Sequence, residues 1–153
     1  MPKTKTATAQ DAQIIMQLYE LRREGVMRVA RKFMVSEFWP ADYEEFKNVL
    51  TGYGADNNAY LRQVLTYWDM AAAMVLNGAL NEQLFFDSNS EPYFVWAKFG
   101  EYIPSGRNDF ANPDFCLHLE KLVSKPQGQR RVKEFRKRIA ARRAQAAKSK
   151  AAQ

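Results

Sequence analysis

The stretch from Asp56 to Phe86 constrains the fold most, because its first part has the periodicity of one long amphipathic helix. Its apolar positions recur at helical spacing and are Leu61, Val64, Leu65, Trp68, Ala72, Val75 and Leu76. The opposite side carries polar residues, namely Arg62, Thr66, Asp69 and Asn77. A helix with one apolar face has to bury that face against other elements. We therefore expect this helix to form the centre of a helical core.

The segment before it predicts a second long helix, over residues 11–37. The apolar positions keep one helical phase through Ile14, Ile15, Leu18, Leu21, Val26, Val29, Ala30 and Phe33. Thr8 or Asp11 can cap its start. Gly25 lies inside the pattern and costs roughly 1 kcal/mol relative to alanine, which tertiary packing can offset. We therefore expect one continuous helix that ends at Phe38-Trp39-Pro40.

The remaining segments predict shorter helices, over residues 41–50, 81–86, 91–103 and 113–123. In the predicted helix over residues 91–103, the residues at helical spacing are Phe94, Val95, Lys98, Phe99 and Tyr102. No segment carries a convincing strand pattern. The expected fold is all-α, a single small helical bundle-like domain of about five to six helices with a basic C-terminal extension.

The expected organisation has three parts. Residues 1–8 are small, polar and slightly basic, so we expect them to be disordered. Residues 9–124 form the helical domain. Beyond Pro126 and Gly128 the composition changes abruptly, and residues 125–153 form a basic tail rich in Ala, Arg and Lys that is helical or disordered.

The positive charge of the chain is concentrated in this tail. The whole chain has a net charge of +6. From Lys125 onward there are eleven Lys or Arg side chains against Glu134 alone, a net charge of +10. Residues 1–124 hold twelve basic and sixteen acidic side chains, a net charge of −4. The tail is therefore the strongest functional signal in the sequence.

A helical tail would surround a narrow apolar line, formed by Val132, Phe135 and Ile139, with basic side chains. The candidate polyanion-binding residues are Arg130, Arg131, Lys133, Arg136, Lys137, Arg138, Arg142 and Arg143. Such a segment suits phosphate contact on DNA or RNA by counterion release, with little sequence discrimination. It equally suits an anionic membrane surface, into which Phe135 and Ile139 would insert. A solubilising tail without a dedicated partner is the third interpretation.

Catalytic and metal-binding patterns are weak. The single histidine, His118, shares a helix face with Asp114 and could act as an oriented base, but a structural role is the more common one for such a residue. Cys116 is the only cysteine, which excludes a disulfide within the chain and favours a buried, inert thiol. No phosphate-binding loop or nucleophile elbow occurs. We therefore expect no catalytic residues, no metal site and no cofactor.

The location predicted from the sequence is the cytoplasm. The N-terminus MPKTKTATAQ lacks the apolar run of a secretory signal. The longest apolar segment, from Met70 to Leu76, is too short to be a transmembrane segment. A lone cysteine fits a reducing compartment.

Three runs of the sequence, VLTYWDMAAAMVLNGALNEQLFF, VWAKFGEYI and FCLHLEKLV, resemble the bacterial helical proteins grouped as domain of unknown function 4760. The positions that carry the resemblance are Trp68, Gly78, Leu84, Phe85, Trp96, Tyr102 and Ile103. The resemblance covers roughly residues 15 to 124 and implies a small all-helical fold without an assigned activity. Some relatives carry an N-terminal membrane helix, from which this chain departs, and the basic extension lies outside the resemblance.

Three hypotheses of function follow. The first is a non-enzymatic helical interaction module whose tail binds a polyanion such as nucleic acid, with the anionic membrane as the alternative partner. The second is a small-molecule sensor or enzyme with a site among the aromatic helices, near Trp68, Trp96 and His118. The third is a homodimer with exposed Phe38, Trp39 or Phe86 at the contact.

Overall fold

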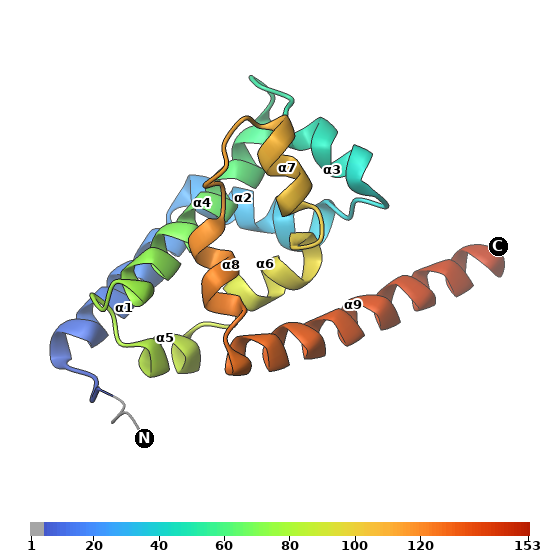
Figure 1. Cartoon of the computed structure of the whole chain (residues 1–153). Coiled ribbons are helices and arrows are strands. Elements are labelled where there is room, and N and C mark those ends of the chain that lie inside the picture. Colours follow the sequence, from blue (N-terminus) through green and yellow to red (C-terminus); the bar gives the residue numbers. More distant parts are fainter. Residues whose placement is uncertain (1–4) are drawn as a thin grey trace.

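The regular structure of this chain is entirely helical in the computed structural model, which describes residues 5–153 (Figure 1). Within these residues the α-helices are α1 (Ala9–Arg23), α2 (Gly25–Lys32), α3 (Tyr43–Leu50), α4 (Asp56–Leu76), α5 (Glu82–Ser88), α6 (Glu91–Phe99), α7 (Ile103–Asp109), α8 (Leu117–Val123) and α9 (Pro126–Ala151). A π-helical turn, η1 (Phe33–Glu37), follows α2. The all-α prediction is confirmed, but the predicted number of five to six helices is too low.

Helix α4 is the central element, as the sequence predicted. It packs against α2, α3 and α8, and Figure 1 shows it running through the middle of the molecule. The predicted face is buried, with Leu61, Val64, Leu65 and Trp68 fully enclosed. Burial of each large apolar side chain contributes about 1.5–3 kcal/mol. The α4 helix therefore supplies much of the core against which the shorter helices pack.

The N-terminal helix is broken, which corrects the prediction of one helix over residues 11–37. Glu24 has φ −58° and ψ 143°, and its carboxylate accepts the backbone N–H groups of Val26 and Met27, so it caps a new helix. Leu21, Val26 and Val29, predicted to face the core, are 53%, 55% and 48% exposed. Ala30 and Phe33 are buried as predicted, and Met27 is buried as well.

The end of this segment is wound more loosely than an α-helix. The N–H of Phe38 donates to the carbonyl oxygen of Phe33 at 2.9 Å, a π-helical bond that spans five residues. The chain then leaves the helix through Trp39 and Pro40. The break at Glu24, this π-turn, the unpredicted helix α7 and the C-terminal helix α9 account for the larger number of elements. The helix predicted over residues 91–103 ends at Phe99.

Thr8 and Asp11 fix the start of α1. The Thr8 hydroxyl accepts the N–H of Asp11, and the Asp11 carboxylate accepts the N–H of Thr8 at 2.7 Å. Asp11 also accepts the N–H of Asn81 at 2.8 Å, which ties α1 to the start of α5. The predicted disorder of residues 1–8 lies partly outside the described residues, since 1–4 are not described. Residues 5–8 are non-helical, and the Lys5 carbonyl accepts the Asn81 side chain.

A buried charge cluster joins α1, α2 and α6 to α4. Glu91, at the start of α6, accepts two hydrogen bonds from Arg31 of α2, at 2.5 and 2.9 Å, and one from the Trp68 indole at 3.1 Å. Arg22 of α1 lies 4.0 Å from the same carboxylate, whose side chain is only 10% exposed. Buried charges persist only where they are paired and hydrogen-bonded. Glu91 is therefore the residue that holds α1, α2, α4 and α6 in register.

Substitution Glu91→Gln removes the only negative charge in this cluster and leaves Arg31 and Arg22 without a counter-ion. We expect the free energy of unfolding, measured by urea titration, to fall by about 3 kcal/mol. The matched control is Glu20→Gln, an exposed glutamate on α1, for which a change below about 0.5 kcal/mol is expected. Equal effects of the two substitutions would show that Glu91 has no such role.

Candidate polyanion interface

The candidate tail is a single helix, α9, which begins directly after α8. Pro126 occupies its first turn, where a missing N–H is tolerated. Gly128 allows the close turn between the two helices, since a Cβ at this position would lie 2.6 Å from the carbonyl oxygen of Val123. At 1.5 Å per residue the helix is about 39 Å long. Figure 1 shows it passing along α6 and extending beyond the other helices.

The predicted apolar line of this helix faces the body. Val132 and Ile139 are buried, and Phe135 packs edge-on against Phe94 of α6 with ring centroids 5.6 Å apart. Beyond Ile139 every residue of α9 is exposed. The first half of the helix is therefore docked on α6, and its last turns project into solvent.

Three of the eight candidate basic residues hold α9 on the body. Arg131 donates to the carbonyl oxygens of Phe86 and Asn89, at 2.6 and 3.2 Å, and its guanidinium lies 3.6 Å from the Phe86 ring centroid. Arg142 lies over the Trp39 ring at 4.2 Å, and Arg143 donates to the Pro40 carbonyl at 3.1 Å. Arginine suits these contacts because its planar cation stacks on rings and donates in several directions.

These contacts also reduce the solvent exposure of residues that the sequence analysis expected at a dimer contact. Phe38, Trp39 and Phe86 are half-buried rather than exposed. Trp39 and Phe86 lie beneath Arg142 and Arg131 of the same chain. The prediction that they are exposed is wrong, because the sequence alone did not place α9 on top of them.

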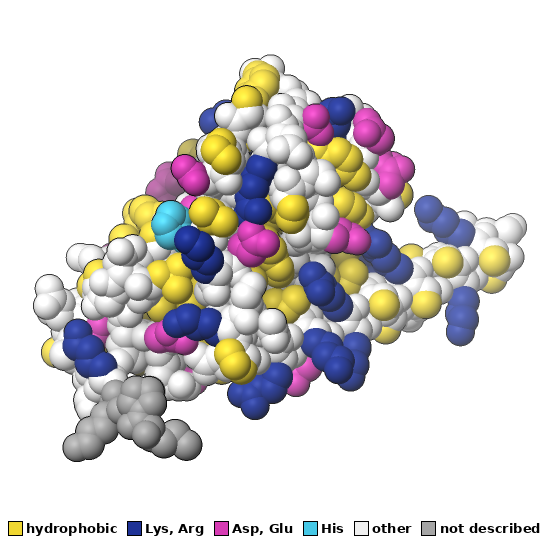
Figure 2. Space-filling model, viewed as in Figure 1, with side chains coloured by type: hydrophobic (Ala, Val, Ile, Leu, Met, Phe, Trp, Pro, Cys, Tyr) yellow, Lys and Arg dark blue, Asp and Glu magenta, His cyan; other side chains and the backbone are white. Residues whose placement is uncertain are grey.

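The outer side of α9 presents basic residues to solvent. Arg130, Lys133 and Lys137 are exposed and have the spacing of one helix face, three and four residues apart. None of them forms an ion pair with another described residue. We call these three residues the outer stripe. Figure 2 shows Lys and Arg side chains along the length of α9.

The last two candidate polyanion-binding residues, Arg138 and Arg136, lie beside the face of α9 that packs on α6. Arg138 is exposed and lies over the Phe135 ring at 5.5 Å. Arg136 lines a groove between α6 and α9. The helix therefore brings the eight predicted residues onto one element but divides them between docking contacts and free positive charge.

The histidine lies in a different environment from the predicted one. Helix α8 begins at Leu117, so Asp114 is not on the helix with His118. The nearest carboxylate is that of Asp69 on α4, which is 3.4 Å from His118 Nδ1 and accepts the N–H of Leu119 at 2.8 Å. Asp69 therefore anchors the start of α8, and His118 is a half-exposed neighbour of that contact. The Cys116 thiol is 1% exposed, and burial raises its pKa, so it has little thiolate character.

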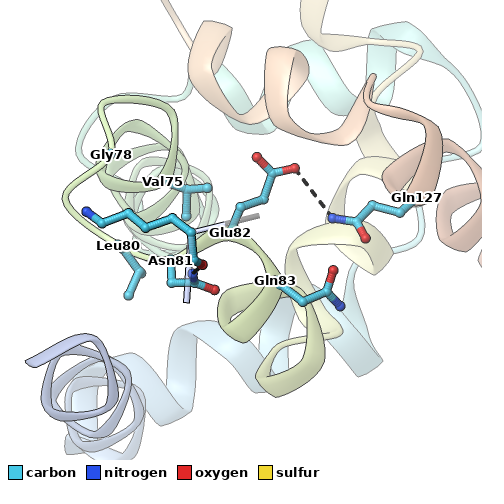
Figure 3. Close-up of a pocket in the computed structure, with 8 residues that line it drawn as sticks. Val75, Gly78, Leu80, Asn81, Glu82, Gln83 and Gln127 are labelled. Carbon is cyan, nitrogen blue, oxygen red and sulfur yellow. Dashed lines mark hydrogen bonds between the residues drawn. The ribbon is translucent and has the colours of Figure 1, made fainter. Parts of the chain in front are cut away.

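A shallow pocket of about 440 Å³ lies where α4, α5 and α9 meet (Figure 3). Its apolar floor includes Val75 and Leu80, and Glu82 and Gln127 extend into it. The Glu82 carboxylate already accepts hydrogen bonds from Lys125 and, at 3.4 Å, from Gln127. The aromatic residues named for a small-molecule site are elsewhere, and Trp68 is fully buried in the core.

Lys98 is the residue that the sequence interpretation missed. It is only 2% exposed, and its ammonium donates to the carbonyl oxygen of Met34 in the π-turn. The ammonium also lies 3.6 Å from the Trp39 ring centroid and 5.2 Å from that of Phe99. Burial, reinforced by Arg142 and Arg143, lowers the pKa of Lys98 to about 7. The sequence did carry a signal, because Lys98 shares the helical spacing of Phe94 and Phe99.

Comparison with known proteins identifies one family. The family model described as Domain of unknown function (DUF4760) matches residues 7–125 and ends where α9 begins. No curated protein and no solved structure matches the chain. Among residues 5–153, no helix has both the length and the apolar composition needed to span a membrane, and no three acidic, His or Cys side chains gather as metal ligands.

Substitution Lys98→Met replaces a buried, unpaired cation by an apolar side chain of similar length. We expect the free energy of unfolding at pH 7 to rise by about 1–4 kcal/mol. The native pKa of about 7 lies below the unfolded value of 10.5, so the unfolded chain binds more protons between these values. The stability of the parent protein therefore rises with pH over this window, and the advantage of the variant shrinks.

The measurement is urea unfolding of both proteins at several values between about pH 7 and about pH 9.5. The matched control is Lys137→Met on the exposed side of α9, for which the difference from the parent should not depend on pH. A Lys98→Met advantage that stays constant with pH would contradict the lowered pKa.

Proposed function

We propose that this chain, which belongs to the family of Domain of unknown function (DUF4760) through residues 7–125, is a non-enzymatic interaction module that binds cytoplasmic nucleic acid through helix α9. The family match covers the helical body of the chain, and the description of the family assigns no activity. The single observation that carries the proposal is the outer stripe, in which Arg130, Lys133 and Lys137 are exposed without an ion-pair partner among the described residues.

The docking of α9 supports this role by pre-forming the helix. An isolated helix of this composition has to pay the cost of ordering when it binds, whereas α9 is already fixed by Val132 and Ile139. The stripe is then a rigid row of cations on the solvent side. Cations of this kind release condensed counterions when they contact backbone phosphates, and they do so on any base sequence.

The exposed end of α9 adds a second contact region. From residue 144 onward every residue of the helix is exposed, and the side chains there are mainly Ala, with Lys148 and Lys150 as the basic ones. Small side chains keep the helix narrow, which lets Lys148 and Lys150 approach a phosphate backbone closely. The body, at −4, is disfavoured from the same contact by its charge.

A membrane surface is the less favoured partner. Phe135 and Ile139 are the residues that would insert into lipid, and both are packed against the body in the docked helix. Their insertion requires α9 to leave α6 and to expose Val132 as well. Nucleic acid contact through the outer stripe requires no such rearrangement.

The proposal predicts a specific salt dependence. The triple variant Arg130→Gln, Lys133→Gln and Lys137→Gln should bind double-stranded DNA at least about tenfold more weakly at moderate salt. The slope of log K against log salt should decrease in magnitude by about 2.7, because each lost phosphate contact contributes about 0.9. Fluorescence anisotropy with a labelled duplex, repeated over a series of salt concentrations, measures both quantities.

The matched control carries the same charge change on the body, as Arg23→Gln, Arg28→Gln and Lys121→Gln, all at exposed positions. This variant should keep the parent slope. Two unrelated duplexes and an RNA should bind with similar affinity. Equal losses in both triple variants, binding that ignores salt, or binding to anionic vesicles in preference to nucleic acid would each refute the proposal.

A further inference from the structure

The groove between α6 and α9 concentrates positive charge on the inner flank of α9, away from the outer stripe. It has a volume of about 380 Å³, and its polar lining consists of Lys98 from α6 and Glu101 from the turn after α6, with Arg136 and Arg143 from α9. Arg136 and Arg143 are seven residues apart, which places them two turns apart on one face of the helix. Three basic side chains and one carboxylate therefore line this groove.

The charges in the groove are not balanced within the protein. None of the four side chains forms an ion pair with another described residue. Arg143 uses one nitrogen on the Pro40 carbonyl and keeps further N–H donors, since a guanidinium has five. Arg142, beside the groove on Trp39, adds a fourth positive charge.

The burial of Lys98 adds a free-energy cost to this excess of positive charge. Its ammonium is almost completely buried, and its contacts are the Met34 carbonyl and the rings of Trp39, Phe94 and Phe99. A carbonyl dipole and ring faces do not neutralise a charge, and buried charges in proteins are normally paired with an opposite charge. The structure thus contains an almost completely buried lysine, next to an open groove, that no carboxylate among the described residues pairs with.

We propose that the groove between α6 and α9 is a binding site for a small phosphate-type oxyanion, held by Arg136 and Arg143 and acting as the counter-ion of Lys98. Arginine pairs bind such tetrahedral dianions through several charge-assisted hydrogen bonds. The volume of the groove accommodates a group of this size. Glu101 at the edge disfavours a larger polyanion that would pass across it.

The site couples anion binding to protonation. The charged and polar groups near Lys98 are Glu101 in the turn after α6, Arg136, Arg142 and Arg143 on α9, and the Met34 carbonyl of η1. The low pKa means that the amine is largely neutral at mildly alkaline pH, and a bound dianion favours its charged form. Binding therefore takes up a proton, and the affinity for the anion falls as the pH rises through about 7.

Sulfate is the informative probe, because it stays a dianion over this range while phosphate itself titrates near pH 6 to 7. The full chain is titrated with sulfate and with inorganic phosphate at constant ionic strength, and the amide resonances of residues 97–101 and 136–143 are followed by NMR. We expect saturable shifts in these two segments. We also expect about tenfold weaker sulfate binding at about pH 8 than at about pH 6.

Variants separate the groove from the outer stripe. Lys98→Met should weaken sulfate binding about tenfold at the lower pH and abolish the pH dependence. Arg136→Gln and Arg143→Gln should each weaken binding, and these two keep the test valid if Lys98→Met alters the fold. The matched control, Lys137→Gln on the outer stripe, should bind sulfate as the parent does. Shifts that do not saturate, or sulfate binding that Lys98→Met leaves unchanged, would overturn the site.

A competition experiment between sulfate and a short oligonucleotide decides whether the groove holds a nucleic acid phosphate or a free oxyanion. If sulfate displaces a short oligonucleotide and Lys98→Met weakens the oligonucleotide equally, the groove holds a nucleic acid phosphate. If oligonucleotide binding is unchanged by Lys98→Met while sulfate binding is lost, the groove holds a free oxyanion. Both outcomes support the groove as an anion site. If the oligonucleotide does not bind at all, the nucleic acid proposal fails, and the sulfate titration with its variants still tests the groove.

Discussion

The burial of the apolar face of α4, with Trp68 at its centre, is the constraint on which the rest of the structure depends. The ring is fully buried, and its N–H needs an acceptor, which Glu91 provides from the start of α6. A buried carboxylate in turn needs cations, and Arg31 and Arg22 supply them from α2 and α1. One buried indole therefore determines the position of three other helices around α4.

The attachment of α9 follows a different principle. Apart from Lys125 and Glu82 just before and beside its start, the helix is held by apolar contacts, by backbone carbonyl groups and by aromatic rings. These partners bind arginine without cancelling its charge. A strongly basic helix can thus be fixed to an acidic body and still present positive charge, on its outer side to solvent and on its inner flank to the groove beside Lys98.

Local pattern was sufficient to predict part of this structure. The buried face of α4, the existence of an apolar line through Val132 and Ile139, and the cap at Thr8, one of two candidates, follow from residues three or four positions apart, which interact within one helix. The break at Glu24 was not predictable from the same pattern, because the apolar phase continues across it. The contact of Asp69 with the N–H of Leu119 was also missed, since it joins residues fifty positions apart.

The sequence by itself determined that the chain is helical, which face of α4 is buried, and that positive charge gathers in the C-terminal segment. Those properties depend on periodicity and composition, which a linear pattern records. Only the tertiary structure decided which basic residues remain available, because the docking of α9 engages Arg131, Arg142 and Arg143 and leaves the outer stripe free. It also decided that Lys98 is a buried cation, since the energy of a charge depends on the distant elements that exclude water from it.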